Sequence, residues 1–161
     1  MIRLTNLADY AIVLLSQMAR EKNQLVSAQY LSDATSLPIP TISKILGALG
    51  RADILESHRG LKGGFKLSRP ASDISVAEVI EAIEGPIALT NCITTHEEHS
   101  KDCSIVDLCQ LRTSWNIVNA AIKDALHGVS LEDITMPQSP DSLSRQVRSA
   151  IAGNNRPETT A

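Results

Sequence analysis

Apolar side chains recur every three or four residues near the start of the chain, which is the period of an amphipathic helix. The repeat runs from Thr5, a suitable N-cap, to Arg20. Its members are Leu7, Ala11, Leu14, Leu15 and Met18. At about 100° per residue, Asp9 lies roughly opposite this stripe and is predicted to point away from the buried face of the helix.

A second short helix is predicted in SAQYLSDATS, with Ser27 as its N-cap. SLPIP then interrupts the chain before a third helix, which has Pro40 in its first turn, where a missing N–H costs nothing. Two helices joined by so short a break predict a helix-turn-helix. The third helix has an apolar stripe of Ile42, Ile45, Leu46 and Leu49, and its opposite face is small, polar and basic, with Thr41, Lys44, Gly47, Ala48 and Arg51.

Two strand-like runs follow, from Ile54 to His58 and from Gly64 to Ser68, and the turn sequence RGLKG joins them. A hairpin after a helix-turn-helix is typical of a DNA-binding wing. Glycines let the backbone approach a groove, and basic side chains can neutralise phosphates or enter a narrow minor groove. The basic side chains here are Arg59, Lys62 and Lys66. The alternative, an ordinary surface hairpin with solvated lysines, is disfavoured by the three preceding helices.

The stretch DISVAEVIEAIEG predicts a fourth helix with a well-defined start. Ser75 is a suitable N-cap, Glu78 completes a capping box, and Ile74 is placed to pack on Val79 as a hydrophobic staple. The acidic side of this helix is interpreted as solvated rather than catalytic, and it consists of Glu78, Glu81 and Glu84.

A polar loop is expected from Gly85 to Asp102, followed by a helix that the capping pattern Ser104-x-x-Asp107 opens. This helix carries an apolar stripe that resembles a coiled-coil seam: Leu108, Leu111, Trp115, Val118, Ile122 and Leu126. Such a stripe needs a partner, either the chain's own core or a second copy. A long helix beyond a compact winged domain favours a homodimer interface, and a dimer suits a two-fold symmetric DNA site.

Together these elements predict a mainly α fold with a small β-hairpin wing. Residues 1–85 are expected to form a winged helix-turn-helix DNA-binding domain, and residues 86–103 a cysteine-bearing loop. Residues 104–136 are expected to form a dimerisation helix and a C-terminal segment. Residues 137–161, rich in Ser, Pro, Gln, Asn and Arg, are expected to be mostly disordered.

The formal net charge of −3 conceals an asymmetry between the two parts of the chain. Residues 1–70 hold nine Lys and Arg against five Asp and Glu, whereas the remainder holds six against thirteen. This distribution indicates an N-terminal part that faces a polyanion such as DNA. The sequence has no run of 18 apolar residues and no charged-then-apolar leader, so we expect a cytosolic protein without a membrane partner. It has no phosphate loop, nucleophile elbow or convincing acid–base set, which argues against an enzyme.

All three cysteines, Cys92, Cys103 and Cys109, lie within 18 residues and outside the predicted DNA-binding domain. The odd count in a cytosolic chain favours free thiols or metal ligands over disulfides. The spacing does not match the paired C-x2-C knuckles of structural zinc sites. An iron-sulfur cluster, zinc, metal-free redox thiols and inert thiols therefore remain open. Candidates for a fourth metal ligand are Asp9, His96 and His99.

Over about residues 1–135, the chain resembles a known family. The start RLTNLADYAI, the stretch from Ile39 to Gly85 and the three following cysteines resemble the winged-helix iron-sulfur regulators of bacteria, of the IscR and NsrR type. The most specific part is the wing pattern of Ser57, Arg59, Gly60, Gly63, Gly64 and Leu67. The run from Cys92 to Trp115 is most similar to the subgroup that regulates the sulfur-mobilisation (SUF) cluster-assembly operon.

The resemblance implies a homodimeric repressor whose helix-turn-helix enters the major groove while the wing contacts the neighbouring minor groove. It also implies that Cys92, Cys103 and Cys109 hold an iron-sulfur cluster, of either the 2Fe-2S or the 4Fe-4S type. The first cysteine interval is longer than usual in the family, and Arg112, which does not ligate iron, stands where IscR-type members have a ligating histidine. Asp9 matches the acidic residue of the first helix that completes the site from the partner subunit in NsrR-like members.

The residues expected to read base edges are Thr41, Ser43 and Lys44, at the start of the third helix. Phosphate contacts are expected from Lys44, Arg51, Arg59 and Lys62, with Gly60 at the wing turn. The predicted function is a transcription factor that senses iron-sulfur cluster status and controls cluster-biogenesis genes. A DNA-binding thiol or zinc switch without a cluster, and an iron-sulfur carrier, are the alternatives.

Overall fold

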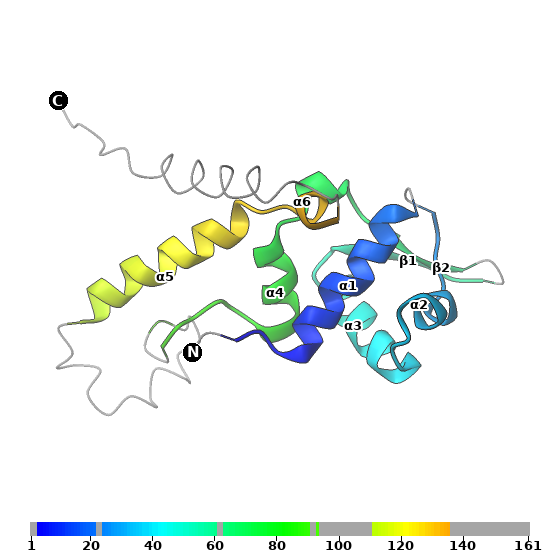
Figure 1. Cartoon of the computed structure of the whole chain (residues 1–161), viewed down its shortest axis with the longest axis horizontal. Helices are drawn as coiled ribbons and strands as arrows, with labels where there is room; N and C mark the ends of the chain where they lie inside the picture. Colours follow the sequence, from blue (N-terminus) through cyan, green and yellow to red (C-terminus); the bar gives the residue numbers. More distant parts are fainter. Residues whose placement is uncertain (1–2, 22–23, 61–62, 91–92, 94–110, 136–161) are drawn as a thin grey trace.

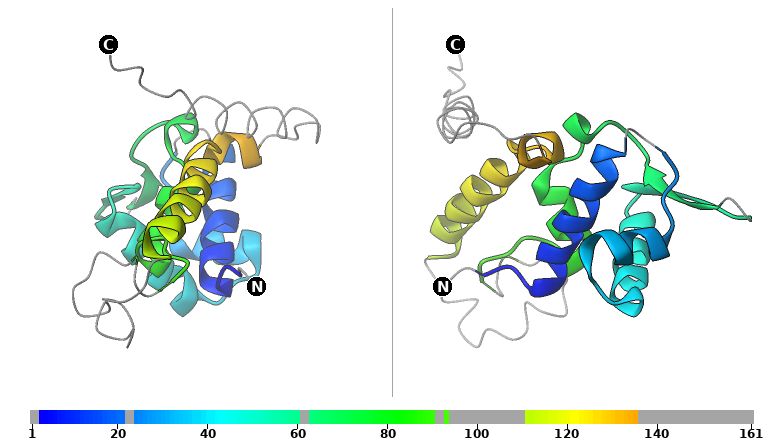
Figure 2. Two further views of the ribbon diagram at one scale, coloured as in Figure 1. Left: turned by 90° about the vertical axis from the view of Figure 1, so that its left-hand side faces the viewer. Right: turned by 45° about the vertical axis from the view of Figure 1, so that its right-hand side comes forward.

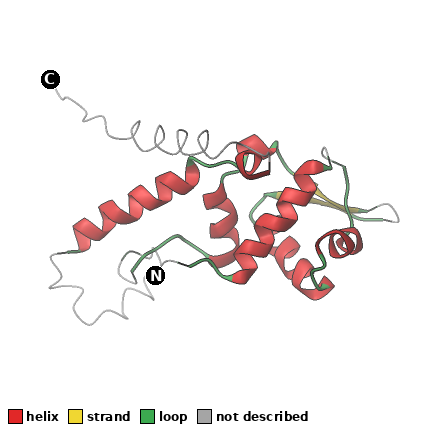
Figure 3. Ribbon diagram, in the orientation of Figure 1, coloured by secondary structure: helices red, strands yellow, loops and turns green. Residues whose placement is uncertain are grey.

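The computed structural model describes residues 3–21, 24–60, 63–90, 93 and 111–135 (Figure 1). Over these residues the fold is mainly helical, with one antiparallel hairpin, as the sequence predicts (Figure 3). In chain order the elements are α1 (Asn6–Arg20), α2 (Ala28–Thr35), α3 (Ile39–Arg51), β1 (Leu55–His58), β2 (Gly64–Leu67), a 3₁₀ turn (Ala71–Asp73), α4 (Val76–Glu84), α5 (Arg112–His127) and α6 (Leu131–Thr135).

Helix α1 lies at the centre of the molecule and contacts α2, α3, α4, α6 and β2. The Thr5 side chain caps it by accepting a 3.3 Å hydrogen bond from the N–H of Ala8. The predicted stripe is buried, except that Leu7 is only half-buried. Asp9 is exposed, in agreement with its predicted position opposite the stripe.

Helices α2 and α3 form the helix-turn-helix. The Ser27 hydroxyl caps α2 by accepting a 3.1 Å hydrogen bond from the N–H of Tyr30, and Ser36 ends it in the left-handed region with φ of 59°. Helix α3 has Pro40 in its first turn, as expected. Its apolar stripe, Ile42, Ile45, Leu46 and Leu49, is buried.

The hairpin is one residue shorter at one end of each strand than the sequence predicts. Strand β1 pairs with β2 so that Leu55 faces Leu67 and Glu56 faces Lys66. The two strands project beyond the helical body (Figure 2, right). An additional pairing, not predicted from the sequence, joins β2 to the chain before α2: Val26 and Phe65 exchange backbone hydrogen bonds of 2.9 and 2.8 Å.

Gly64 is required by this additional pairing. A Cβ at residue 64 would lie 2.6 Å from the Val26 carbonyl oxygen, which is closer than side-chain carbons approach backbone. The glycine at this point of the wing therefore allows the close contact that fixes β2 to the body of the protein.

Helix α6 was not predicted, although its signal is present in the sequence. Ser130 and Asp133 form a reciprocal cap, with hydrogen bonds of 3.1 Å from the Asp133 N–H to the Ser130 hydroxyl and 2.9 Å from the Ser130 N–H to the Asp133 carboxylate. The helix inserts the fully buried Leu131 into the core. The chain that follows α5 is thereby returned to the winged domain.

Helix α5 lies at the opposite end of the long axis from the wing (Figure 1), and contacts α4. Its described part begins at Arg112, and the predicted start at Ser104 and the seam residue Leu108 lie outside the described residues. The proposed tail at 137–161 also lies outside them. Among the helices that the structure describes, none combines the length and apolarity needed to cross a bilayer.

Candidate functional site

The exposed face of α3 is basic and sterically open. Ser43, Lys44 and Arg51 are exposed, and Thr41 is half-buried at the first turn. The small residues between them, Gly47 and Ala48, leave this face shallow. Within the described part of the chain, neither Lys44 nor Arg51 has an ion-pair partner. A polyanion could therefore approach this face without first displacing a bound carboxylate.

The wing supplies fewer free positive charges than its sequence suggests. Glu56 binds Lys66 at 3.0 Å and lies 3.6 Å from His58 Nε2. The hydrogen bond and charge of Lys66 lower the pKa of the Glu56 carboxyl, so the carboxylate remains charged at neutral pH. Lys66 is thus paired across the hairpin, which reduces the positive charge that it offers to a phosphate. Arg59 is exposed, whereas Lys62 lies outside the described residues.

The turn of the wing has the geometry that its glycines allow. Gly60 has φ of 123°, in the region that other residues rarely adopt, and its carbonyl accepts a 2.9 Å hydrogen bond from the N–H of Gly63. Arg59 and Gly60 are both exposed to solvent. This part of the wing is free to enter a groove.

A polar cluster that sequence reasoning missed holds α2 against α1. The Tyr30 hydroxyl donates a hydrogen bond to Glu21, and Gln17 donates to both, at 3.4 Å to Tyr30 and 3.2 Å to Glu21. The hydrogen bond to Glu21 raises the pKa of Tyr30, so Tyr30 remains the donor. The cluster connects the start of α2 to the end of α1.

The predicted seam on α5 is divided into two parts in a single chain. Leu111, Trp115 and Val118 are exposed by 61, 40 and 44 %. Ile117, which was not assigned to the seam, is 68 % exposed beside them. Ile122 and Leu126 are instead half-buried and line a cavity of about 270 Å³ together with Leu4, Ile80 and Ile87. The N-terminal half of α5 therefore presents an apolar surface that the described residues leave uncovered.

The chain that leads to Cys92 is fixed to the middle of α5. Asn119, only 8 % exposed, accepts a 3.0 Å hydrogen bond from the N–H of Leu89 and donates one of 3.0 Å to the carbonyl of Ile87. Just before this segment, at the end of α4, the Glu84 carboxylate accepts a 2.8 Å hydrogen bond from the N–H of Thr5. Sequence reasoning missed Asn119. Its signal in the sequence is that a polar residue stands between the apolar positions of the seam.

Of the predicted metal ligands, the structure describes only Asp9. Cys92, Cys103, Cys109, His96 and His99 lie outside the described residues. Among the described residues, no group of three or more His, Cys, Asp or Glu side chains could hold a metal ion. The Asp9 carboxylate is exposed on the first turn of α1, with no side-chain partner in the described part of the chain.

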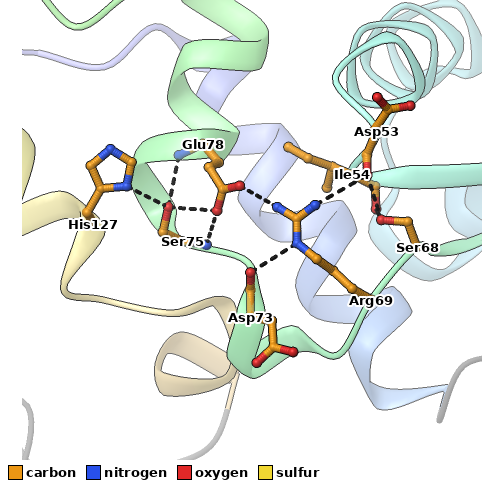
Figure 4. Close-up of polar contacts among 8 residues, drawn as sticks. All are labelled: Asp53, Ile54, Ser68, Arg69, Asp73, Ser75, Glu78 and His127. Atoms are coloured by element: carbon orange, nitrogen blue, oxygen red, sulfur yellow. Dashed lines mark hydrogen bonds and ion pairs between the residues drawn. The ribbon is translucent and has the colours of Figure 1, made fainter.

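The three glutamates of α4 each have a partner: Glu84 is exposed, as expected of a solvated acidic face, and Glu78 and Glu81 are half-buried. Glu78 forms an ion pair with Arg69 and accepts hydrogen bonds from the N–H and hydroxyl of Ser75, at 2.8 and 2.9 Å (Figure 4). Glu81 binds Lys123 of α5 at 2.8 Å, and Glu84 binds the N–H of Thr5. These glutamates connect α4 to the wing, to α5 and to α1, respectively.

The Glu78 carboxyl has a lowered pKa despite its partial burial. Burial raises the pKa, but the hydrogen bonds from Ser75 and the charge of Arg69 together outweigh it. Glu78 is therefore a charged link between the N-terminus of α4 and the residues that follow β2.

Comparison with known proteins assigns the family. Residues 4–137 match the family model of Rrf2, described as an iron-dependent transcriptional regulator. The regulator NsrR of Bacillus licheniformis is 30 % identical over 138 residues, which cover 85 % of this chain and 94 % of that protein. Among solved structures, CymR, the global cysteine regulator of B. subtilis, has a TM-score of 0.64 at 21 % identity, covering 86 % of this chain and all of that one. IscR of T. potens has a TM-score of 0.56 at 19 % identity, covering 88 % of this chain and 96 % of that one. The chain belongs to the Rrf2 family of winged-helix transcriptional regulators.

Proposed function

We propose that the protein is a cytoplasmic, homodimeric repressor whose affinity for DNA depends on an iron-sulfur cluster held by Cys92, Cys103 and Cys109. The observation that carries the proposal is the attachment of the segment before Cys92 to α5 through Asn119. This attachment connects the cysteine segment directly to the helix that is expected to join the two subunits.

DNA binding is assigned to the exposed face of α3 and to the wing. Thr41, Ser43 and Lys44 read base edges in the major groove, because the start of a recognition helix is the part that reaches them. Lys44 also binds a phosphate, as do Arg51, Arg59 and Lys62 on either side, and Gly60 allows the wing backbone to approach the minor groove. Since Lys66 is already paired with Glu56, we assign it no phosphate.

Dimerisation is assigned to the uncovered apolar half of α5. Exposed large apolar residues on one helix are expected where a second protein surface covers them. Leu111, Trp115 and Val118 are such residues, and Ile117 extends the patch. Ile122 and Leu126, which pack partly within their own chain, are proposed to border the interface, and Leu108 to continue it.

The ligand set fits an iron-sulfur cluster by its chemistry. Thiolates are the soft ligands that these clusters require, and three of them leave one position for a different donor. The Asp9 carboxylate is exposed and has no side-chain partner among the residues that the structure describes, so it is available for that position, and we assign it to the partner subunit's site. When bound, the cluster would supply a link between the cysteine segment of one chain and α1 of the other.

This link explains how the cluster could control DNA binding. Helix α1 contacts both helices of the helix-turn-helix, α2 and α3, which together form the reading head of each subunit. A tie between α1 and the partner's cysteine segment therefore restricts the distance between the two reading heads of the dimer. Loss of the tie relaxes the spacing. A coupling of about 1–3 kcal/mol is sufficient, because it changes affinity about 5- to 150-fold.

The genes under control are proposed to be those of SUF-type cluster assembly. This assignment rests on the similarity of the run from Cys92 to Trp115 to that subgroup. The similarity to proteins named NsrR and IscR supports a role in transcriptional regulation, but those names do not identify the genes that the present chain controls.

A thiol switch without a metal is the second candidate. It is favoured by the match to CymR, a cysteine regulator with the same fold. In this case Cys103 and Cys109 would pair on oxidation, and the DNA-binding face would keep its assignment. An iron-sulfur carrier is a weaker candidate, because it gives no role to the open face of α3 or to the wing.

The deciding experiment is the visible absorption spectrum of protein purified without oxygen, with iron and sulfide counted per chain. A coloured protein with matching iron and sulfide supports the cluster. Asp9→Ala should then alter or bleach the spectrum, whereas Asp33→Ala, an exposed acid on α2, should leave it unchanged. Colourless protein that cannot be reconstituted would favour the thiol or zinc switch.

A further inference from the structure

The side chain of Arg69 joins three segments that are separate in the fold. Its Nε donates a 3.0 Å hydrogen bond to the carbonyl of Asp73, and a terminal nitrogen donates one of 3.4 Å to the carbonyl of Asp53. Its other terminal nitrogen forms the ion pair with Glu78 (Figure 4). A guanidinium can serve three acceptors at once because its donors form a rigid planar fork.

Asp53 is the point at which the recognition helix turns into the wing. It follows the end of α3 in a left-handed conformation, with φ of 55°, and its N–H donates a 3.3 Å hydrogen bond to Gly50. Its carbonyl accepts a second hydrogen bond, of 2.6 Å, from the Ser68 hydroxyl after β2. Arg69 therefore holds the junction that relates α3 to the hairpin.

On the other side, Glu78 belongs to the attachment of α5. Its second oxygen accepts from Ser75, and the Ser75 hydroxyl lies 3.2 Å from Nδ1 of His127 in the last turn of α5. Backbone hydrogen bonds flank this contact, at 2.9 Å from Val76 to Val129 and 2.7 Å from Leu131 to Ile74. The end of α5 is thus fixed to the same turn that carries Glu78.

We propose that Arg69 and Glu78 are positioning residues that fix the orientation of α3 and the wing relative to α5. The wing and α5, the elements that the pair relates, lie at opposite ends of the molecule (Figure 1), and this inference rests on the proposed DNA-binding dimer. The pair sets the relative orientation of the two reading heads without touching DNA.

The pair is suited to orientation rather than to holding the fold together. The two side chains are 32 and 37 % exposed, and ion pairs at such positions contribute little to stability. The nearby core contains Ile74, Val79 and Leu131, all buried, and neither side chain of the pair belongs to it. Variants at Arg69 and Glu78 are therefore expected to fold.

Glu78→Gln is the most informative variant, because glutamine can still close the capping box with Ser75 while losing the charge that attracts Arg69. Glu81→Gln is the matched control, since it removes an ion pair of the same helix while the contacts that fix the end of α5, between Ser75 and His127 and along the backbone, remain. Arg69→Gln and the double variant, Arg69→Gln with Glu78→Gln, complete a double-mutant cycle that measures the coupling between the two side chains.

The measured quantity is the dissociation constant for two duplexes. One carries a two-half-site sequence selected by the wild-type protein from randomised DNA, and the other has one half-site replaced by unselected sequence. Glu78→Gln should weaken binding to the full site by about 2- to 30-fold while changing binding to the single half-site by less than about twofold. Glu81→Gln should change neither, and the double variant should resemble the single ones. Equal losses on both duplexes, no loss, or additive losses would overturn the proposal.

A second measurement does not depend on DNA. Spin labels on genetically encoded keto amino acids at the exposed positions Ser57 in the wing and Asn116 in α5 report their separation. Glu78→Gln should broaden the intrachain distance distribution, and Glu81→Gln should leave it as in wild type. If no duplex binds the wild-type protein, the proposed function is wrong. The distance measurement then tests the positioning role of Arg69 and Glu78 by itself, and an unchanged width of the distribution rejects that role.

Discussion

The side-chain amide of Asn119 on α5 accepts a 3.0 Å hydrogen bond from the backbone N–H of Leu89, three residues before Cys92. Together with the bond from Asn119 to Ile87, it makes the middle of α5 the anchor of the chain that enters the cysteine segment. We therefore expect a change in that segment to act first on α5, whose exposed apolar half is the proposed dimer interface.

Asn119→Ala should loosen this anchor. The substitution leaves a backbone N–H and a carbonyl without their partner, and an unsatisfied buried group costs about 1–3 kcal/mol. We expect a loss of this size in the free energy of unfolding by urea, together with faster loss of cluster absorbance in air. Asn116→Ala, at an exposed position of the same helix, is the control and should change the free energy of unfolding by less than about 0.5 kcal/mol. Equal behaviour of the two variants would show that the anchor has no role.

Lys44→Ala should weaken DNA binding through the loss of one phosphate contact. The plot of log K against log salt concentration should become shallower by about 0.9, because one fewer counterion is released. Fluorescence anisotropy with a labelled duplex between low and moderate salt measures this slope. Lys123→Ala removes a lysine from α5, which takes no part in the proposed interface with DNA, and should keep the wild-type slope. An unchanged slope for Lys44→Ala would contradict the assignment of the α3 face.

Gly64→Ala should displace β2 from its contact with Val26. The added Cβ would lie 2.6 Å from the Val26 carbonyl oxygen, so the wing must shift for the chain to fold. We expect a loss of about 1–3 kcal/mol in stability and weaker DNA binding. At Gly50, within α3, an added Cβ meets nothing within 4 Å. Gly50→Ala should therefore be neutral or should stabilise the protein by up to about 1 kcal/mol, and a similar loss at both positions would refute the packing argument.

The lowered pKa of Glu78, which its hydrogen bonds from Ser75 and the charge of Arg69 maintain, predicts a particular dependence of stability on pH. Because the folded state lowers the pKa of Glu78, the unfolded state binds more protons when the carboxyl begins to titrate. The contribution is present above the unfolded pKa of about 4.3 and is lost as pH falls through the lower folded pKa. Urea unfolding at several pH values should give a steeper acid loss for wild type than for Glu78→Gln. Glu56, whose pKa is also lowered, is present in both proteins, so the difference reports Glu78. Parallel curves would contradict this prediction.

Local signals in the sequence were sufficient to predict the winged helix-turn-helix. Thr5, Ser27 and Ser75 each cap the helix that the apolar period indicates, and Pro40 marks the start of α3. The order of three helices and a glycine-rich hairpin then leaves few alternatives. Ser130 and Asp133 carried the same kind of signal for α6.

Contacts between distant residues could not be predicted from local patterns. The charge of Lys66 suggested a phosphate ligand, but its pairing with Glu56 depends on the register of the hairpin. Asn119 resembled an ordinary polar position until the fold brought Ile87 and Leu89 beside it. The division of the α5 stripe likewise depends on how α4 packs against Ile122 and Leu126. The cysteine cluster and its ligand set remain predictions.

Control of DNA binding by the cluster is tested most directly by the affinity of the cluster-loaded protein for its selected duplex, measured without oxygen before and after the cluster is removed. Cys103→Ala provides a permanently cluster-free form for comparison. We predict dissociation constants that differ by about 5- to 150-fold between loaded and cluster-free protein, with the dimer retained in both. Equal affinities, with iron and sulfide confirmed in the loaded sample, would contradict the claim that the cluster controls DNA binding.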